Sequence, residues 1–243
     1  MPNHYVRFLY NAPAILYRKA LIVGDTHFGI EQKLRSKGVY DEQFSRRLFE
    51  KLKGLITAHN AEKTIFLGDV KENITVLDEK TKQMLRELSE ICDIMIVKGN
   101  HDGSIEEFLP AEVSAPEGEV YGELGLCHGH SWPGKELMEC RYLVMGHQHP
   151  MVKIKDTLGK SHVEPAWIVS SANKEKVAGH YEKFNPEIEL VLMPAFNPLV
   201  GSVIGPEGKK HLGPVLNNKL FKLNDALVFR LNGTCLGRLG GTG

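Results

Sequence analysis

Five short apolar runs recur in the first 150 residues, and each leads directly into glycine, aspartate, asparagine or histidine. The runs lie at 20–23, 64–67, 94–97, 124–127 and 142–145. Continuous apolar runs of this length, bounded by turn residues, are typical of strands that are buried on both faces. The pattern therefore predicts buried strands that deliver polar side chains at their carboxyl ends.

Helical periodicity fills the intervals between the first three runs. One helix is expected after Asp41, which would cap it, with an apolar face formed by Phe44, Leu48, Leu52, Leu55 and Ile56. A second helix is expected over 78–91, with inward residues Leu77, Met84, Leu85 and Leu88. Residues 28–40 are interpreted as a loop. This order predicts an α/β fold with a parallel sheet, in which ligands bind beyond the carboxyl ends of the strands.

The chain after residue 104 is expected to consist mostly of short strands and loops. Strands are expected at 119–121, 124–127, 141–145, 151–155, 166–170, 188–193 and 226–239, and short helices at 104–109, capped by Ser104, and at 133–138. Asn232-Gly233 predicts a two-residue hairpin turn, and residues 5–18 predict another hairpin that turns at 11–13. Because no linker divides the chain, we expect one domain over 1–243 with two packed sheets.

Composition restricts the class of protein. Lys plus Arg and Asp plus Glu both number 30, so the net charge is zero, which argues against strong non-specific nucleic-acid binding. The four cysteines, Cys92, Cys127, Cys140 and Cys235, form no C-x-x-C pair and are interpreted as buried free thiols of a reducing compartment. The sequence shows no signal-peptide pattern, and no apolar run approaches the ~20 residues of a membrane helix. We therefore expect a cytoplasmic protein without membrane contact.

The polar residues at the strand ends are of metal-binding types. They are Asp25, His27, Asp69, Asn100, His128 or His130, His147 and His149. One tetrahedral zinc ion needs four ligands, so this set is too large for one cation and suits two, with Asp69 able to bridge them. Asp25 and His27 lie two positions apart, so we expect their side chains to point the same way from extended backbone, and we expect the same of His147 and His149. The mixture of imidazole and oxygen ligands favours Mn, Fe, Zn, Co or Ni over Ca, and we place Mn first.

A dinuclear centre of this kind suits chemistry at phosphorus. Two cations ~3.5–4 Å apart bind phosphoryl oxygens, activate a water and stabilise an in-line displacement. His101 follows Asn100 but projects differently, so it is the candidate for general acid or charge stabiliser at the leaving oxygen. The expected substrate is a phosphate ester.

The order of these motifs resembles the calcineurin-like metallophosphoesterase superfamily. Its D-x-H, G-D-x-x-D, G-N-H-[DE], lone His and G-H-x-H motifs correspond to 25–27, 68–72, 99–102, His128 and 146–149. The resemblance implies a four-layer α/β-β/α sandwich and His101 as the catalytic histidine. It implies one metal on Asp25, His27, Asp69 and His149, and another on Asp69, Asn100, His128 and His147.

A narrower resemblance is to the SbcD-related phosphoesterases of archaea and some bacteria. The segments that carry it are 25–31, 68–71 and 194–198. Some members of that subfamily lie beside Lhr-type helicases, so the resemblance implies DNA or RNA as substrate and a helicase as a partner. A nuclease of this size would need a homodimer or another partner to hold a long duplex, and alone it would bind nucleic acid weakly and in a salt-dependent way.

Two positions leave alternatives open. Glu72 replaces the final Asp of G-D-x-x-D, which usually orients the catalytic histidine, so either Glu72 or Asp102 could serve His101. Three basic residues of the 28–40 loop (Lys33, Arg35 and Lys37), together with Lys71, could be solvated or could contact phosphate.

Three functions compete. The first is a phosphodiesterase acting on nucleic acid or nucleotides. The second is a phosphomonoesterase acting on a small metabolite or phosphoprotein, and it would use the same metal centre. The third is a non-catalytic scaffold, which the complete ligand set argues against.

Overall fold

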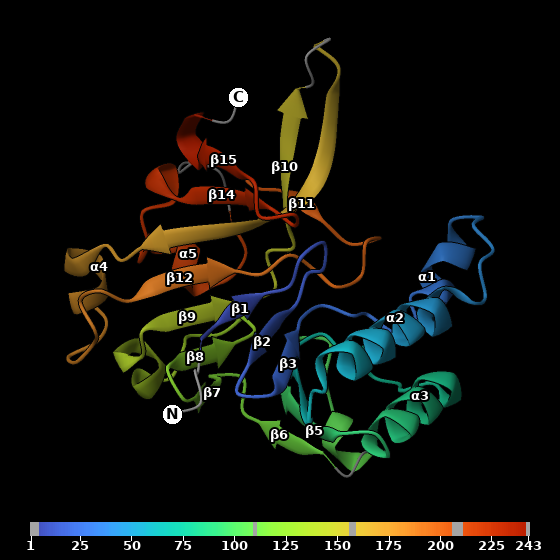
Figure 1. Ribbon diagram of the computed structural model, residues 1–243. Coiled ribbons are helices and arrows are strands. Elements are labelled where there is room, and N and C mark those ends of the chain that lie inside the picture. Colours follow the sequence, from blue (N-terminus) through green and yellow to red (C-terminus); the bar gives the residue numbers. More distant parts are fainter. Residues whose placement is uncertain (1–4, 109–110, 156–158, 206–210, 242–243) are drawn as a thin grey trace.

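The protein is described here from a computed structural model, which covers residues 5–108, 111–155, 159–205 and 211–241 (Figure 1). Two sheets pack face to face, and helices cover their outer faces. Among the described residues, no helix is long and apolar enough to cross a membrane.

The first sheet has six strands in chain order. They are β1 (Arg7–Phe8), β2 (Ile15–Tyr17), β3 (Ala20–Val23), β4 (Lys63–Leu67), β5 (Asp93–Val97) and β6 (Glu112–Ser114). Strands β3 to β6 run parallel, and the predicted N-terminal hairpin is present as the antiparallel pair β1–β2. The predicted parallel α/β arrangement is therefore confirmed, with β6 as a strand that the sequence pattern missed.

Helices α2 (Phe44–His59) and α3 (Glu79–Ser89) pack on the outer face of this sheet. The predicted inward faces are confirmed by the burial of Leu48, Leu52 and Ile56 in α2 and of Met84, Leu85 and Leu88 in α3. Phe49 is also fully buried, because the apolar face of α2 is wider than the predicted stripe. Asp78 caps α3 by accepting a hydrogen bond from the Thr81 amide at 3.0 Å.

The segment before α2 differs from the prediction. Residues 28–40 are not a loop throughout, because Glu31–Ser36 forms helix α1. Asp41 does not cap α2, whose N-cap residue is Gln43. The Glu31 carboxylate instead accepts hydrogen bonds from the Ser45 amide and hydroxyl, both at 2.6 Å, so the acceptor comes from the preceding helix. Asp41 forms an ion pair with Arg47.

The second sheet contains nine strands within the described residues. They are β7 (Glu119–Tyr121), β8 (Leu124–Cys127), β9 (Tyr142–Met145), β10 (Pro150–Lys155), β11 (Ser161–Ser171), β12 (Glu189–Leu192), β13 (Ser202–Val203), β14 (Leu227–Arg230) and β15 (Cys235–Arg238). Their order is β13-β10-β11-β12-β9-β8-β7, with β14 paired to β11 and β15 to β14. Strands β8, β9 and β12 run parallel at its centre.

Short helices complete the fold. They are α4 (Lys174–Ala178), α5 (Pro214–Asn217) and the 3₁₀ helices η1 (Ile105–Glu107), η2 (Lys135–Glu139), η3 (Leu223–Asp225) and η4 (Leu239–Gly241). The Ser104 side chain does not cap η1, because Ser104 adopts a left-handed conformation and makes no side-chain capping bond. The predicted end of that helix, at residue 109, lies outside the described residues.

The β14–β15 hairpin is present, but its turn has three residues rather than two. The Arg230 amide donates to the Thr234 carbonyl at 2.9 Å, and Gly233 takes a φ of +82°, which suits a glycine at the third loop position. Cys235 lies on this hairpin and is exposed, whereas the other three cysteines are buried as predicted; all four are free thiols.

The buried strands contribute alternate side chains to separate layers. Ile22, Ile65 and Met95 of the first sheet meet Leu124 and Val144 of the second in a core between the sheets. The opposite faces of the same strands pack against α2 and α3 on one side and against short helices on the other. These layers form the expected four-layer sandwich.

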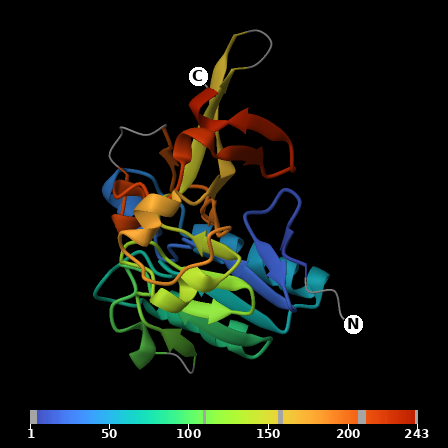
Figure 2. The same ribbon diagram turned by 90° about the vertical axis from the view of Figure 1, so that its left-hand side faces the viewer.

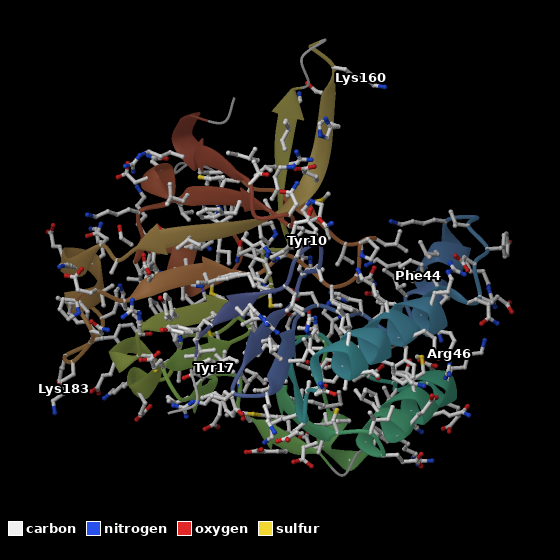
Figure 3. All side chains as sticks on the ribbon, in the orientation of Figure 1. Tyr10, Tyr17, Phe44, Arg46, Lys160 and Lys183 are labelled. Atoms are coloured by element: carbon white, nitrogen blue, oxygen red, sulfur yellow. The ribbon has the colours of Figure 1, made fainter. Side chains whose placement is uncertain are left out.

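One element extends beyond the layers. The β10–β11 hairpin stands out from the second sheet (Figure 2), and Lys160 lies near its tip (Figure 3). It begins at Pro150, immediately after one of the predicted metal-binding motifs.

Candidate metal centre

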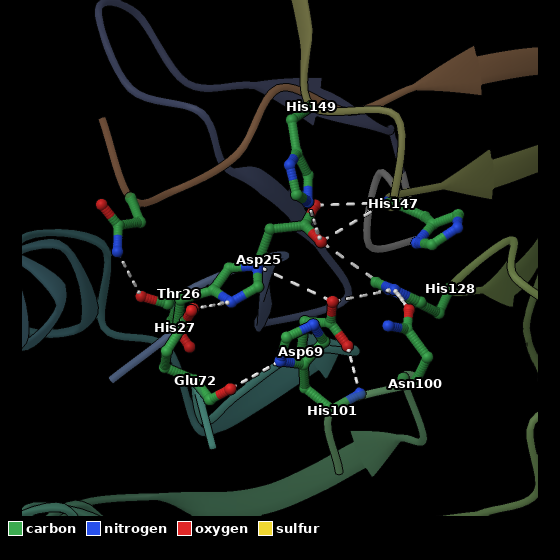
Figure 4. A network of polar contacts seen from close by, with 12 residues as sticks. Asp25, Thr26, His27, Asp69, Glu72, Asn100, His101, His128, His147 and His149 are labelled. Atoms are coloured by element: carbon green, nitrogen blue, oxygen red, sulfur yellow. Dashed lines mark hydrogen bonds and ion pairs between the residues drawn. The ribbon is translucent and has the colours of Figure 1, made fainter. Parts of the chain in front are cut away.

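The loops that follow the buried strands bring the predicted ligands to one place (Figure 4). Five of these residues adopt positive φ angles between 43° and 64°: Asp25, His27, Asp69, His147 and His149. The expectation of extended backbone at the paired ligands is therefore wrong. Residues other than glycine rarely adopt this conformation, which costs roughly 1–2 kcal/mol each. Concentrated strain of this kind is typical of functional sites.

Two glycines allow the loops to approach each other closely. A Cβ atom on Gly68 would lie 2.3 Å from Nδ1 of His128, and one on Gly99 would lie 2.3 Å from the Asp69 amide nitrogen. Neither position has room for a side chain. Backbone pairing adds to this arrangement, since the His27 amide donates to the Asp69 carbonyl at 2.9 Å.

One cluster contains Asp25, His27, Asp69 and His149, whose ligand atoms all lie within 4.8 Å of one another. Nε2 of His149 lies 3.0 Å from Asp25 Oδ1, and Nε2 of His27 lies 3.7 Å from Asp69 Oδ2. Both nitrogens are buried without a hydrogen-bond partner among the described residues. Buried polar atoms normally have partners, so this donor set fits a cation that binds between them.

A second cluster shares Asp69 with the first and adds His128 and His147. Nδ1 of His128 donates to the Leu67 carbonyl at 2.9 Å, while its Nε2 faces Asp69 Oδ2 at 3.4 Å and Asn100 Oδ1 at 3.2 Å. With Nδ1 protonated, a neutral His128 presents a lone pair to these oxygens. Either a second proton or a cation would satisfy that arrangement.

The electrostatics of the centre reflect this crowding. Burial lowers the pKa of His128, but the Asp69 and Asp25 carboxylates outweigh burial and raise it to about 9. Burial and the positive charge of His128 lower the pKa of His147 to about 4. Burial raises the pKa of Asp69, but the hydrogen bond and the charge of His128 have the larger combined effect and bring this pKa below its ordinary value. The positive charge of His128 therefore keeps the carboxylate of Asp69 ionised, the form in which a carboxylate binds metal.

The geometry distinguishes between His128 and His130. His128 is fully buried between the two metal-binding loops, whereas His130 is partly exposed and lies outside the described clusters. The His130 ring lies 5.3 Å from the His128 ring, centroid to centroid. His130 is therefore a neighbour of the second cluster.

The partner of His101 differs from both predicted alternatives. Nδ1 of His101 lies 2.6 Å from the main-chain carbonyl oxygen of Glu72, to which it donates. The Glu72 carboxylate lies elsewhere, 2.8 Å from His27 Nδ1 and 2.6 Å from Lys33 Nζ. The Glu72 carboxylate therefore pairs with His27 rather than with His101, although its ligand oxygen lies within 4.8 Å of a ring nitrogen of His101. A carboxylate behind a histidine is the usual way in which a ligand imidazole is oriented.

Asp102 does not serve His101 either. Its buried carboxylate accepts hydrogen bonds from the Val70 and Gly99 amides, both at 2.9 Å. It therefore joins the loop after β4 to the loop after β5. Asp102 is a structural residue of the site in this geometry.

Lys71 is buried, so neither of its two predicted positions, in solvent or against a phosphate, is the one it adopts. It is 1% exposed, and its ammonium donates to the carbonyls of Asn73, Ile74 and His101 at 2.6, 2.6 and 2.7 Å. All three of its donors are thus used by main-chain oxygens. Lys71 fixes the backbone of His101, and the neighbouring Glu72 carbonyl fixes its ring.

We expect the substitution Lys71→Met to reduce kcat by about tenfold to a hundredfold with a small change in KM, because His101 loses its backbone anchor. The unpaired carbonyls should also lower the free energy of unfolding by about 2–4 kcal/mol. Steady-state kinetics and urea unfolding of the metal-free protein measure both effects. Lys80→Met, on the exposed face of α3, is the matched control. An unchanged kcat in Lys71→Met would contradict the positioning role.

Two buried amides, which the sequence did not single out as functional, hold the ligand loops. Asn197 Nδ2 donates to the Thr26 carbonyl at 3.0 Å, which gives the Phe196-Asn197-Pro198 turn a structural role. Gln148 lies between His147 and His149 and bonds through its amide to both main-chain groups of Leu212. The position of Gln148 between two candidate ligand histidines was the sequence signal that could have revealed it.

A cavity of about 460 Å³ opens over the centre. Its wall includes His101 and Asn100 on the metal side and Lys33 and Lys37 of the α1 region. Arg35 points elsewhere and pairs with Glu42 at 2.8 Å. Of the three basic residues predicted together, two therefore face the cavity and one does not.

Comparison with known proteins agrees with this geometry. Residues 18–128 match the calcineurin-like phosphoesterase family. Within this segment lie Asp25, His27, Asp69, Asn100 and His128, and the remaining ligand candidates follow at His147 and His149. The matched family uses divalent metal ions, and the match indicates that the chain is a hydrolase, with Asp and His groups that could bind a metal ion.

Two solved structures are similar to this chain to different degrees. The nuclease MPE of Pseudomonas putida is 20% identical, with a TM-score of 0.60 over 95% of this chain and 94% of that chain. Yfce, a phosphoesterase from E. coli, is 17% identical over 90% of this chain and 97% of its own, with a TM-score of 0.45. A comparison with curated proteins found no match. The first similarity establishes the metallophosphoesterase fold.

Proposed function

We propose that the protein is a dinuclear phosphodiesterase that acts on nucleic acid or nucleotides. The observation that carries the proposal is the position of Asp69, whose carboxylate belongs to both ligand clusters. The first cation would be held by Asp25, His27, Asp69 and His149, and the second by Asp69, Asn100, His128 and His147. The proposal treats residues 1–243 as one catalytic domain, since both sheets supply ligands.

Two bound cations would supply positive charge to the phosphoryl oxygens and a water of lowered pKa. Among the chain's own residues, His101 in its imidazolium form would donate the Nε2 proton to the leaving oxygen, while its Nδ1–H stays on the Glu72 carbonyl and orients the ring. Lys33 and Lys37 would attract the anionic substrate to the cavity. The mixed nitrogen and oxygen donor set supports Mn as the first choice, with Fe, Zn, Co or Ni as alternatives.

The nucleic-acid part of the proposal has separate support. The structurally similar Pseudomonas putida protein is named as a nuclease. The cavity combines the proposed metal ligands with Lys33 and Lys37 in its wall, whereas the net charge of the chain is zero. We therefore propose weak, salt-dependent binding of single strands by this chain alone, and a second copy or a helicase as the partner that holds longer nucleic acid.

The test is hydrolysis of bis(4-nitrophenyl) phosphate and of 4-nitrophenyl phosphate, with Mn added and after chelation. We expect diester cleavage to fall by about 100-fold or more when the metal is removed. Single-stranded and duplex DNA and RNA would follow. A strong monoester preference would move the search to small phosphorylated metabolites or phosphoproteins. Two bound metal ions without turnover of either ester would favour the scaffold function.

A further inference from the structure

Two leucines with half-exposed side chains stand on the wall of the metal cavity. Leu199 is 48% exposed and Leu212 is 50% exposed, and both line the same cavity as His101 and His147. Single exposed leucines are common on protein surfaces and need no explanation. These two differ because each is fixed to a ligand loop by a buried amide side chain.

Leu212 is held to the loop that carries His147 and His149. The Gln148 side-chain amide donates to the Leu212 carbonyl at 2.6 Å and accepts from the Leu212 amide at 3.2 Å. Gln148 is only 6% exposed. The next residue, Gly213, packs so closely on the Gly129 carbonyl that an added Cβ would lie 1.9 Å from the oxygen. Leu212 is therefore fixed on two sides.

Leu199 is held in the same way to the loop that carries Asp25 and His27. The Leu199 amide donates to Asn197 Oδ1 at 2.9 Å, and Asn197 Nδ2 donates to the Thr26 carbonyl at 3.0 Å. Asn197 is fully buried. Both leucines thus keep a set position relative to the metal cluster, which is what a binding subsite needs.

We propose that Leu199 and Leu212 form the subsite that packs against the base of the nucleotide adjoining the scissile phosphate. The inference rests on the proposed function and narrows it to substrates that carry a planar base beside the phosphate. The faces of such a base are apolar. The phosphate would be attracted by the charged residues of the cavity, Lys33 and Lys37, whereas the face of a base gains from contact with apolar side chains. Apolar contact reads no hydrogen-bonding edge, so this subsite should tolerate all bases.

The test compares two diesters with the same leaving group. Thymidine 5′-(4-nitrophenyl phosphate) carries a base, and methyl 4-nitrophenyl phosphate does not. For the Mn-loaded Leu199→Ala/Leu212→Ala protein, we expect kcat/KM for the thymidine ester to fall about tenfold. The methyl ester should change by less than about twofold, as for an ordinary surface substitution. Leu227→Ala, a 40% exposed leucine that does not line this cavity, is the matched control.

A binding measurement separates this inference from the proposed function. Thymidine 5′-monophosphate would be titrated into both Mn-loaded proteins by calorimetry. If wild type hydrolyses neither ester, the proposed function fails, and weaker nucleotide binding by the double variant would still support the subsite. Equal losses with both esters, no loss with either, or equal nucleotide affinity in the two proteins would overturn it.

Discussion

Asp69→Asn is expected to reduce phosphodiester hydrolysis on the order of 1,000-fold. Asp69 is the residue that the two clusters share, so an amide in its place would weaken both proposed cation sites together. The amide oxygen can still accept the hydrogen bond that the His101 amide donates to Asp69 Oδ1 at 2.9 Å. The loop should therefore keep its shape, and the loss should reflect charge and metal binding.

Metal content distinguishes this explanation from misfolding. Elemental analysis after dialysis against Mn should show two equivalents in wild type and fewer in Asp69→Asn, with matching circular dichroism spectra. Asp93→Asn, an exposed aspartate at the start of β5, is the control and should retain both metal and activity. Full metal occupancy together with nearly normal kcat in Asp69→Asn would argue against a shared carboxylate.

His101→Ala is expected to lower kcat by about 10²–10⁴-fold, the range for loss of a general acid. The ring is held by the Glu72 carbonyl at Nδ1, and His101 lines the cavity, so its removal leaves the proposed metal ligands in place. Metal content and KM should therefore change little. This separates His101 from Asp69, whose substitution should change metal content.

The dependence on the leaving group tests the proton-donor role directly. A 4-nitrophenolate leaves readily without a proton, whereas the more basic phenolate depends more strongly on protonation as it leaves. The loss in His101→Ala should therefore be larger for methyl phenyl phosphate than for methyl 4-nitrophenyl phosphate. His180→Ala, a histidine stacked on Trp132 outside the cavity, is the control. Equal losses for both esters would assign His101 to charge stabilisation rather than proton donation.

The sequence predicted well those features that depend on neighbouring residues. The apolar runs gave five strands that are buried in the structure, and helical spacing gave the inward faces of α2 and α3. The ligand set also followed from local pattern, because parallel strands end at one edge of a sheet. The structure places these side chains together, and their roles as metal ligands stay a prediction.

Errors arose where a residue's partner lies far along the chain. The sequence predicted that Asp41 caps α2, but the Ser45 amide of α2 donates to the Glu31 carboxylate of α1. The sequence predicted that Lys71 is solvated or contacts phosphate, but its ammonium donates to the carbonyl of His101, 30 residues away. Lys71 and Glu31 have long side chains with several possible acceptors or donors nearby, and only the packed loops select among them.

The sequence by itself determined the α/β sandwich and the candidate ligands of the site, because strand burial and the residue types at the strand ends are local properties. Tertiary structure alone decided which atoms those side chains meet. It turned the Glu72 carboxylate to His27, gave His101 a carbonyl partner, and joined Asn197 to Thr26 across 171 residues. The reason is that hydrogen bonds select partners by position to within a fraction of an ångström, and those positions are set by packing across the whole fold.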